Sequence, residues 1–362
     1  MRAIPTPPRH ARAQPGHGVH IEGDPRRLAP LAAAWFALYG CFTQAWFMGT
    51  LFFLSGLLAA GALARRGPGR FARERLFRLG APLLLFMLVI HPLTVYAFYD
   101  HGRLRHTLGL ARFYAGFLLR GKVLSASGPL WFVEALLGFC LVYALFRALR
   151  PAPAAGARTA PGSGVLLLLA LGIGAGAFLI RLDWPIGSSF GFLQPCFFAS
   201  YLVLFGLGIH AGERGWLEAL PWTSARRWLT TGLLGIPVFF LLMAASGARS
   251  GGPLLWLGGR HWQAAAYALW EGLVAMAMTL GLVGWFRRHG AWDNRFTRAC
   301  AAHSFRLYVF HTPVLVGLAV ALAAWHAPLL AKHAVVAPLA ILATLALAQG
   351  LGRVPGLAAI TR

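Results

Sequence analysis

CFTQAWFMGTLFFLSGLLAAGALARRGPGRFARERLFRLGAP, residues 41 to 82, contains the two signals that decide the fold of this chain. Its first part is an apolar run ending in Phe52 to Gly56 (FFLSG), and it is long enough to cross a bilayer, which takes about 20 residues. A short arm rich in arginine follows, before the next apolar helix begins at Pro82. The arm carries Arg65, Arg66, Arg70, Arg73, Arg75 and Arg78. Because arginine is enriched in cytoplasmic loops, the stretch predicts a membrane helix whose C-terminal end faces the cytoplasm.

The composition indicates an integral membrane protein. Of the 362 residues, 58% are hydrophobic and only 12% are charged, about half of the charged share that is usual in soluble domains. The net charge of +23 would indicate a nucleic-acid partner in a soluble protein. Here the basic residues lie mostly in short loops between apolar runs, so membrane topology explains them and no nucleic-acid partner is predicted.

The four cysteines are scattered and lack the spacing of a zinc site or of a disulfide framework, so no metal is predicted. The first residues are basic and rich in proline, and they lack the apolar core of a secretory signal peptide. We therefore predict a disordered arm over residues 1–28 and a transmembrane domain over residues 29–356.

The apolar runs predict an all-α, polytopic transmembrane helix bundle of about nine spans. They cover about residues 30–62, 80–99, 128–149, 165–181, 195–212, 228–246, 263–286, 304–325 and 334–352. Gly40 is a plausible break in the first run, and Arg353 and Pro355 are expected to stop the last one. An amphipathic run over residues 108–119 is suited to lie on the membrane surface.

Charge in the loops predicts the orientation. The loops on the side of the arginine arm carry 18 Lys and Arg residues, and those on the opposite side carry 9. The excess places the arm and the C-terminus in the cytoplasm. With nine spans, the N-terminal arm and its five arginines would lie outside.

The arginine arm also suits an anionic ligand. Arg75 and Arg78 are three residues apart and would share one face of a helix, where two guanidinium groups can hold a phosphate. The alternative is that they only anchor the cytoplasmic side of the membrane.

Charged and titratable residues inside apolar runs are the other candidates, because such residues are costly to bury in a membrane. Glu134 follows Trp131 by one turn, and the alternative is that it simply reaches water at a helix end. His311 follows Tyr308 by one turn and could act as a base, or could be hydrogen-bonded to a neighbouring helix. Glu271, in the seventh run, is a candidate of the same kind.

Three motifs in order carry a resemblance to a known family. They are Thr43 to Gly49 with FFLSG at 52–56, the arm from Gly67 to Pro82 with its Arg75-x-x-Arg78, and Gly128 to Glu134 with Ser304, Tyr308, His311 and Pro313 near the end. Together they resemble the acyltransferase 3 family of membrane proteins, and most closely its branch that includes glucan biosynthesis protein C. The resemblance covers about residues 40 to 356.

The resemblance implies about ten transmembrane helices, both termini in the cytoplasm, and a place in the bacterial inner membrane. It implies transfer of an acetyl or succinyl group from acyl-CoA, a co-substrate and not a bound cofactor, to a hydroxyl of a sugar or glycan at the lipid membrane. It places the phosphates of coenzyme A at Arg75 and Arg78, and we expect the neighbouring Arg73 to join them. We also expect the substrate cavity to be lined by Trp131, Glu134, Tyr308 and His311.

This sequence departs from the family pattern at its N-terminus. Its members begin with a helix that carries an arginine and, about ten residues later, an essential histidine. Arg9 and His20 have that spacing, but Pro15 and Gly16 lie between them in a polar arm, so we take the match as chance. We therefore expect either a longer protein with a misplaced start codon or a truncated, inactive member; a non-enzymatic glycan transporter is a further alternative. The catalytic base is unassigned, with His311 and Glu134 as candidates.

Overall fold

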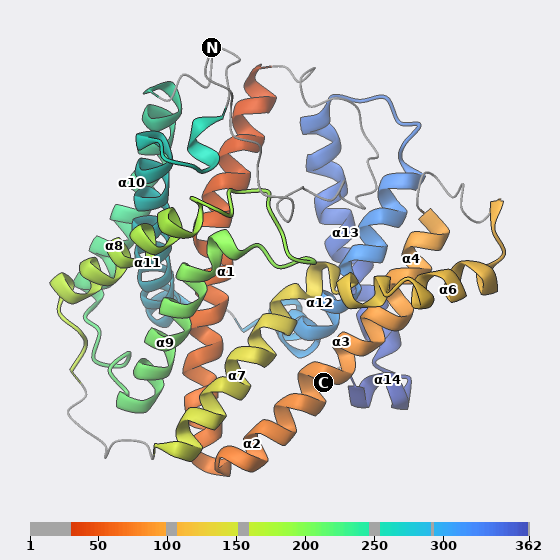
Figure 1. Ribbon diagram of the computed structural model, residues 1–362, viewed down its shortest axis with the longest axis horizontal. Coiled ribbons are helices and arrows are strands. Elements are labelled where there is room, and N and C mark those ends of the chain that lie inside the picture. The colour runs from red at the N-terminus through yellow and green to blue at the C-terminus, as the bar shows by residue number, and fades with distance from the viewer. Residues whose placement is uncertain (1–29, 99–106, 151–158, 246–253, 291–292, 361–362) are drawn as a thin grey trace. The chain divides into compact units, whose positions relative to one another are not determined.

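The computed structural model describes residues 30–98, 107–150, 159–245, 254–290 and 293–360 (Figure 1). Regular structure in these residues is helical, apart from one isolated β-bridge between Phe190 and Leu193. Nine helices among them are long and apolar enough to cross a membrane, so the all-α polytopic bundle that the sequence predicts is confirmed. The predicted arm over residues 1–28, with Arg9 and His20, lies outside the described residues.

The helical elements follow one another along the chain, with short 3₁₀ and π segments (η) between α-helices. They are α1 (Pro30–Arg66), α2 (Pro68–Arg75), η3 (Leu76–Gly80), α3 (Ala81–Leu85), η4 (Phe86–Ile90), α4 (His91–Phe98), α6 (Leu110–Leu119), η6 (Lys122–Ser125), η7 (Gly128–Leu130), α7 (Trp131–Leu149), α8 (Ser163–Ile180), η8 (Pro195–Phe197), α9 (Phe198–Arg214), α10 (Trp222–Ala245), η10 (Leu255–Leu257), α11 (Trp262–His289), α12 (Arg295–Ala321), α13 (Leu329–Leu351) and α14 (Pro355–Ile360).

The opening stretch corrects two predictions. Gly40 is not a break, because α1 continues through it for 37 residues, about 55 Å at 1.5 Å per residue. The arginine arm is not a separate linker either. The chain turns at Gly67, whose φ of +74° favours glycine, and Pro68 at once starts a helix that continues to Phe98. Arg70 to Arg78 therefore form the first turns of the second span.

The described residues fall into two compact units, and each is treated by itself. Unit 1 comprises the described residues of Trp35–Phe71 and Ala144–Ala291, and unit 2 those of Gly16–Ala34, Ala72–Tyr143 and Trp292–Arg362. Unit 1 is built around α11, against which α8 and α10 pack along their length (Figure 1). Much of α11 is buried, and its small residues let the neighbouring backbones approach closely.

The FFLSG segment forms the contact between α1 and α9 in unit 1. A Cβ atom added to Gly56 would lie 2.2 Å from the Phe205 carbonyl oxygen. In the same way, a Cβ atom on Gly208 would lie 2.0 Å from the Phe53 carbonyl oxygen. The two backbones touch, so glycine in this motif is required by helix packing.

In unit 2, α12 packs against α13, and α4 packs against both α6 and α12 (Figure 1). The predicted amphipathic run at 108–119 forms the helix α6, with Phe117 buried. The ninth span ends near Arg353 as expected. Pro355 does not stop the chain, however, because it begins the short helix α14.

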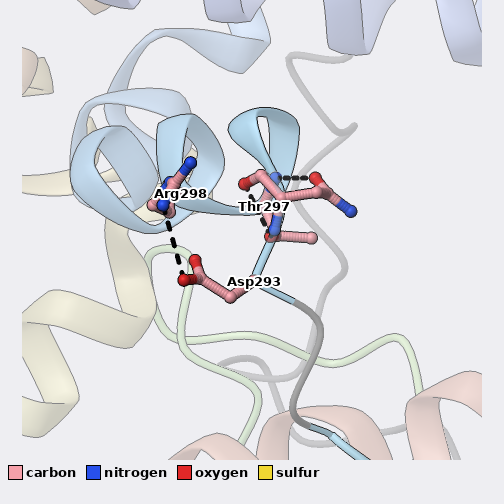
Figure 2. Close-up of polar contacts among 4 residues, drawn as sticks. Asp293, Thr297 and Arg298 are labelled. Atoms are coloured by element: carbon pink, nitrogen blue, oxygen red, sulfur yellow. Dashed lines mark hydrogen bonds and ion pairs between the residues drawn. The ribbon is translucent and has the colours of Figure 1, made fainter.

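The start of α12 lies well before the apolar run that predicted it at residue 304. Figure 2 shows the reason, a capping box in which the Asn294 side chain accepts a hydrogen bond from the Thr297 N–H at 2.9 Å. In return the Asn294 N–H donates to the Thr297 hydroxyl at 3.1 Å. The neighbouring ion pair of Arg298 and Asp293, at 3.4 Å, is exposed and adds little. A polar cap, not hydropathy, sets where this helix begins.

Candidate functional site

Of the residues that the sequence singles out for chemistry, all but Glu271 lie in unit 2. They come from three segments, namely the arginine-bearing turns of α2 and η3, the first turn of α7 and the middle of α12. On these segments lie Arg73, Arg75, Arg78, Trp131, Glu134, Tyr308 and His311.

The arginine pair sits where the backbone changes from α to π geometry. Arg75 ends α2 and is half-buried, whereas Arg78 is exposed within the π-helix η3, and Arg73 is exposed one turn earlier. A π turn holds more residues than an α turn, so Arg75 and Arg78 are separated further around the helix axis than their spacing predicts. π segments of this kind occur frequently at functional sites.

The second span runs antiparallel to α7. The Arg75 guanidinium acts electrostatically on the Cys140 thiol, and a Cβ atom on Gly80 would lie 3.9 Å from Leu137. Further along, a Cβ atom on Gly128 would lie 3.1 Å from the ring of Phe86. Arg75 is therefore level with Cys140, nine residues or about 14 Å along the helix from Trp131 at the start of α7.

The start of α7 is in contact with α12. The Tyr308 hydroxyl donates a hydrogen bond to the Pro129 carbonyl oxygen, 179 residues away in the sequence. The Tyr308 ring also meets the Phe132 ring edge-on, with centroids 6.2 Å apart. The structure thus brings together the motif around Trp131 and the motif around His311.

His311 is half-buried, and its ring stacks on that of Tyr308 with centroids 5.7 Å apart. Its Nδ1 lies 2.5 Å from the Tyr308 carbonyl oxygen. A carbonyl can only accept a hydrogen bond, so in the neutral ring we place the proton on Nδ1. Nε2, 3.4 Å from the Thr312 hydroxyl, is then the nitrogen that can take up a proton.

Glu134 is half-buried in the first turn of α7. The N-terminus of a helix carries a partial positive charge, which stabilises a carboxylate in this position. Trp131 is also half-buried and lies one turn before it. Both belong to the end of α7 that Tyr308 contacts, whereas Arg75 is near Cys140 in the middle of the helix.

Unit 1 contains a buried ion pair between Glu271 and Arg181. The sequence singles out Glu271 but not Arg181. Glu271 of α11, one of the candidates, accepts a hydrogen bond from Arg181 at 2.5 Å, and both side chains are buried. A carboxylate inside an apolar helix, such as Glu271, indicates that a basic partner lies nearby. The sequence does not show which of the 33 Lys and Arg residues is that partner.

The nine helices of the described residues that are long and apolar enough to cross a membrane define a multi-pass membrane protein. A family model described as an acyltransferase domain matches residues 16–353, nearly the whole chain. The chain therefore belongs to the acyltransferase 3 family of membrane O-acyltransferases. The comparisons with curated proteins and with solved structures give no match.

Proposed function

We propose that this protein transfers an acyl group, acetyl or succinyl, from acyl-CoA to a hydroxyl of a sugar or glycan. It would do so in the bacterial inner membrane, with the arginine-bearing turns and the C-terminus in the cytoplasm. The family supports the reaction class. The observation that carries the finer proposal is the order of groups along α7, with Arg75 near Cys140 in the middle of the helix and Tyr308 in contact with its beginning.

That order suits the shape of acyl-CoA. The molecule carries phosphates at one end and a thioester at the other end of a long flexible arm. Arg75 and Arg78, with Arg73 beside them, offer guanidinium groups for the phosphates. An arm laid along α7 would then bring the thioester towards Trp131, Glu134 and His311, about 14 Å further on.

The chemistry at that end needs a base. The hydroxyl oxygen of the acceptor attacks the thioester carbon, its proton passes to the base, and the thiolate of coenzyme A leaves with the electron pair of the C–S bond. His311 Nε2 and the Glu134 carboxylate are the two groups of this region that can accept the proton. Tyr308, whose hydroxyl is engaged with Pro129, positions the His311 ring by stacking.

Acyl transfer from radiolabelled acetyl-CoA and succinyl-CoA to glycan, measured in membranes, tests the proposal. We expect Arg75→Ala with Arg78→Ala to lower kcat/KM for acyl-CoA by about 10²-fold or more, because two charge-assisted contacts to phosphate are lost. The matched control is Arg226→Ala with Arg227→Ala, which removes two exposed arginines from α10, also on the predicted cytoplasmic side. Equal effects of the two pairs would contradict the phosphate role, and absence of labelled glycan with the wild type would favour a transporter.

A further inference from the structure

His91 is a titratable side chain of unit 2 that the proposed function does not use. It is the first residue of α4 and directly follows the π-helix η4. Its backbone N–H donates a hydrogen bond to the Phe86 carbonyl oxygen across the π turn. In an α-helix, side chains five residues apart point about 140° away from each other. The wider π turn brings them closer, and the ring centroids of Phe86 and His91 are 6.0 Å apart.

These two rings pack against the turn with which α7 begins. A Cβ atom added to Gly128 would lie 3.1 Å from the Phe86 ring and 3.6 Å from Nδ1 of His91. Gly128 is buried, and its φ of +50° favours glycine. The backbone and the two rings therefore both exclude a larger residue here. It follows that the rings limit where the peptide of Gly128 and Pro129 can lie.

The same turn holds the Tyr308 side chain. The Pro129 carbonyl oxygen accepts the hydrogen bond of the Tyr308 hydroxyl. The Tyr308 ring in turn stacks on the ring of His311, with centroids 5.7 Å apart. A continuous series of contacts therefore leads from His91, through this turn and Tyr308, to the His311 imidazole. Every step of the series lies within unit 2.

A second element limits the movement of His91. The Phe117 ring of α6 is buried, and its centroid lies 6.3 Å from that of His91. Close-packed side chains have little freedom to move, and His91 contacts rings on two separate elements. Its ring is therefore suited to hold the neighbouring turn in one place.

We propose that His91 is a positioning residue for His311, and that it acts through the turn at Gly128 and Pro129 and through Tyr308. With the His91 ring in place, the Pro129 carbonyl oxygen stays within reach of the Tyr308 hydroxyl, and the Tyr308 ring fixes the plane of the His311 imidazole. Without the ring, the turn gains room, the hydrogen bond weakens and His311 rotates more freely. The effect on catalysis rests on the proposed function, whereas the positioning of His311 does not.

Nuclear magnetic resonance tests the positioning without acyl transfer. Full-length protein labelled with ¹³C in its histidines is purified in detergent, and the His311 signals are those missing from His311→Asn. Stacking on Tyr308 shifts the carbon-bound ring protons of His311 upfield. We expect His91→Ala to move them towards the position of an unstacked imidazole. We expect His91→Phe, which keeps a ring against Phe86 and Phe117, to leave them near the wild-type position. Unchanged His311 signals in His91→Ala would overturn the proposal.

Tyr96→Phe is the matched control for general loosening of this region. It removes the hydrogen bond from the Tyr96 hydroxyl to the Leu108 carbonyl oxygen, 2.9 Å long, which joins α4 to the segment before α6. A shift of the His311 signals as large as that in His91→Ala would overturn the specific role of His91. Size-exclusion profiles and melting temperatures establish that each variant is folded. If His91→Ala does not fold, His91→Val, which leaves a smaller cavity, replaces it with the same expectations.

A double-mutant cycle on kcat for acyl transfer tests the route through Tyr308. We expect His91→Ala to lower kcat about tenfold in the wild-type background but less than about twofold in Tyr308→Phe, which already lacks the hydrogen bond to Pro129. Equal factors in the two backgrounds would contradict action through Tyr308. Absence of transfer by the wild type, with His311 signals that move as expected, would contradict the proposed function alone. Transfer that His91→Ala leaves unchanged would contradict the catalytic effect of His91 alone.

Discussion

His311 shows how one side chain can be prepared for proton transfer by its own helix. The Tyr308 carbonyl fixes the proton on Nδ1, and stacking on the Tyr308 ring fixes the plane of the imidazole. Nε2 is therefore presented as the acceptor without help from a distant residue. Glu134, in the first turn of α7, has no such orientation from its own helix.

This difference gives a prediction that separates the two candidate bases. If His311 is the base, His311→Asn lowers kcat by about 10²- to 10⁴-fold while KM for acyl-CoA changes little, because an amide cannot take the proton. Glu134→Gln then has a smaller effect on kcat. Steady-state kinetics of both variants in membranes make the comparison, and the reverse order of effects would assign the base to Glu134.

At the scale of the element, hydropathy predicts the nine spans found among the described residues, because a bilayer demands long apolar runs. Helix ends follow other physics. Asn294 caps α12 ten residues before the apolar run. After the turn at Gly67, a helix begins at once at Pro68 and includes the arginine arm. Gly40 does not break α1, since glycine at a single position costs a long helix only about 1 kcal/mol.

The sequence does not show which helices contact one another. FFLSG can be recognised as a motif in the sequence, but its contact with Phe205 on α9 cannot. Tyr308 and Pro129, or Arg181 and Glu271, are joined only by the packing of helices far apart in the chain. The sequence could therefore name candidate residues, and the structure was needed to say which of them meet.

The close contact between α1 and α9 can be tested with two glycine substitutions on α9, one inside the contact and one outside it. Gly208→Ala would push a methyl group against the Phe53 carbonyl and should destabilise the protein by about 1–3 kcal/mol, the usual cost of overpacking. Gly206→Ala lies two residues away on the same helix, where nothing lies within 4 Å of the new Cβ. Thermal unfolding in detergent measures both, and similar melting temperatures for the two variants would contradict a tight α1–α9 contact.

At the scale of the whole molecule, the excess of basic loops predicts one orientation in the membrane. A green fluorescent protein fused after Gly215, at the end of α9, should fluoresce, because this end is predicted to be cytoplasmic. Alkaline phosphatase fused after Phe190, before α9, should be active, because it is exported. The two fusions differ by one span, and the opposite pattern would reverse the orientation and move Arg75 away from cytoplasmic acyl-CoA.

The π segment η3 has a consequence for how this protein can tolerate insertions and deletions. A π turn accommodates one residue more than the α-helix around it, so removing Leu76 or Phe77 would leave an ordinary α-helix of nearly the same length and hydropathy. The residues on either side of the deletion would keep nearly the same orientation about the helix axis, because the π turn already spreads its extra residue over the rotation of the α residues around it. Arg75 would then keep its place near Cys140, but the next arginine would follow it by two positions, on nearly the opposite side of an α-helix. The extra residue therefore sets the angle between the two arginines, and we expect its loss to weaken use of the acyl donor while leaving membrane insertion intact.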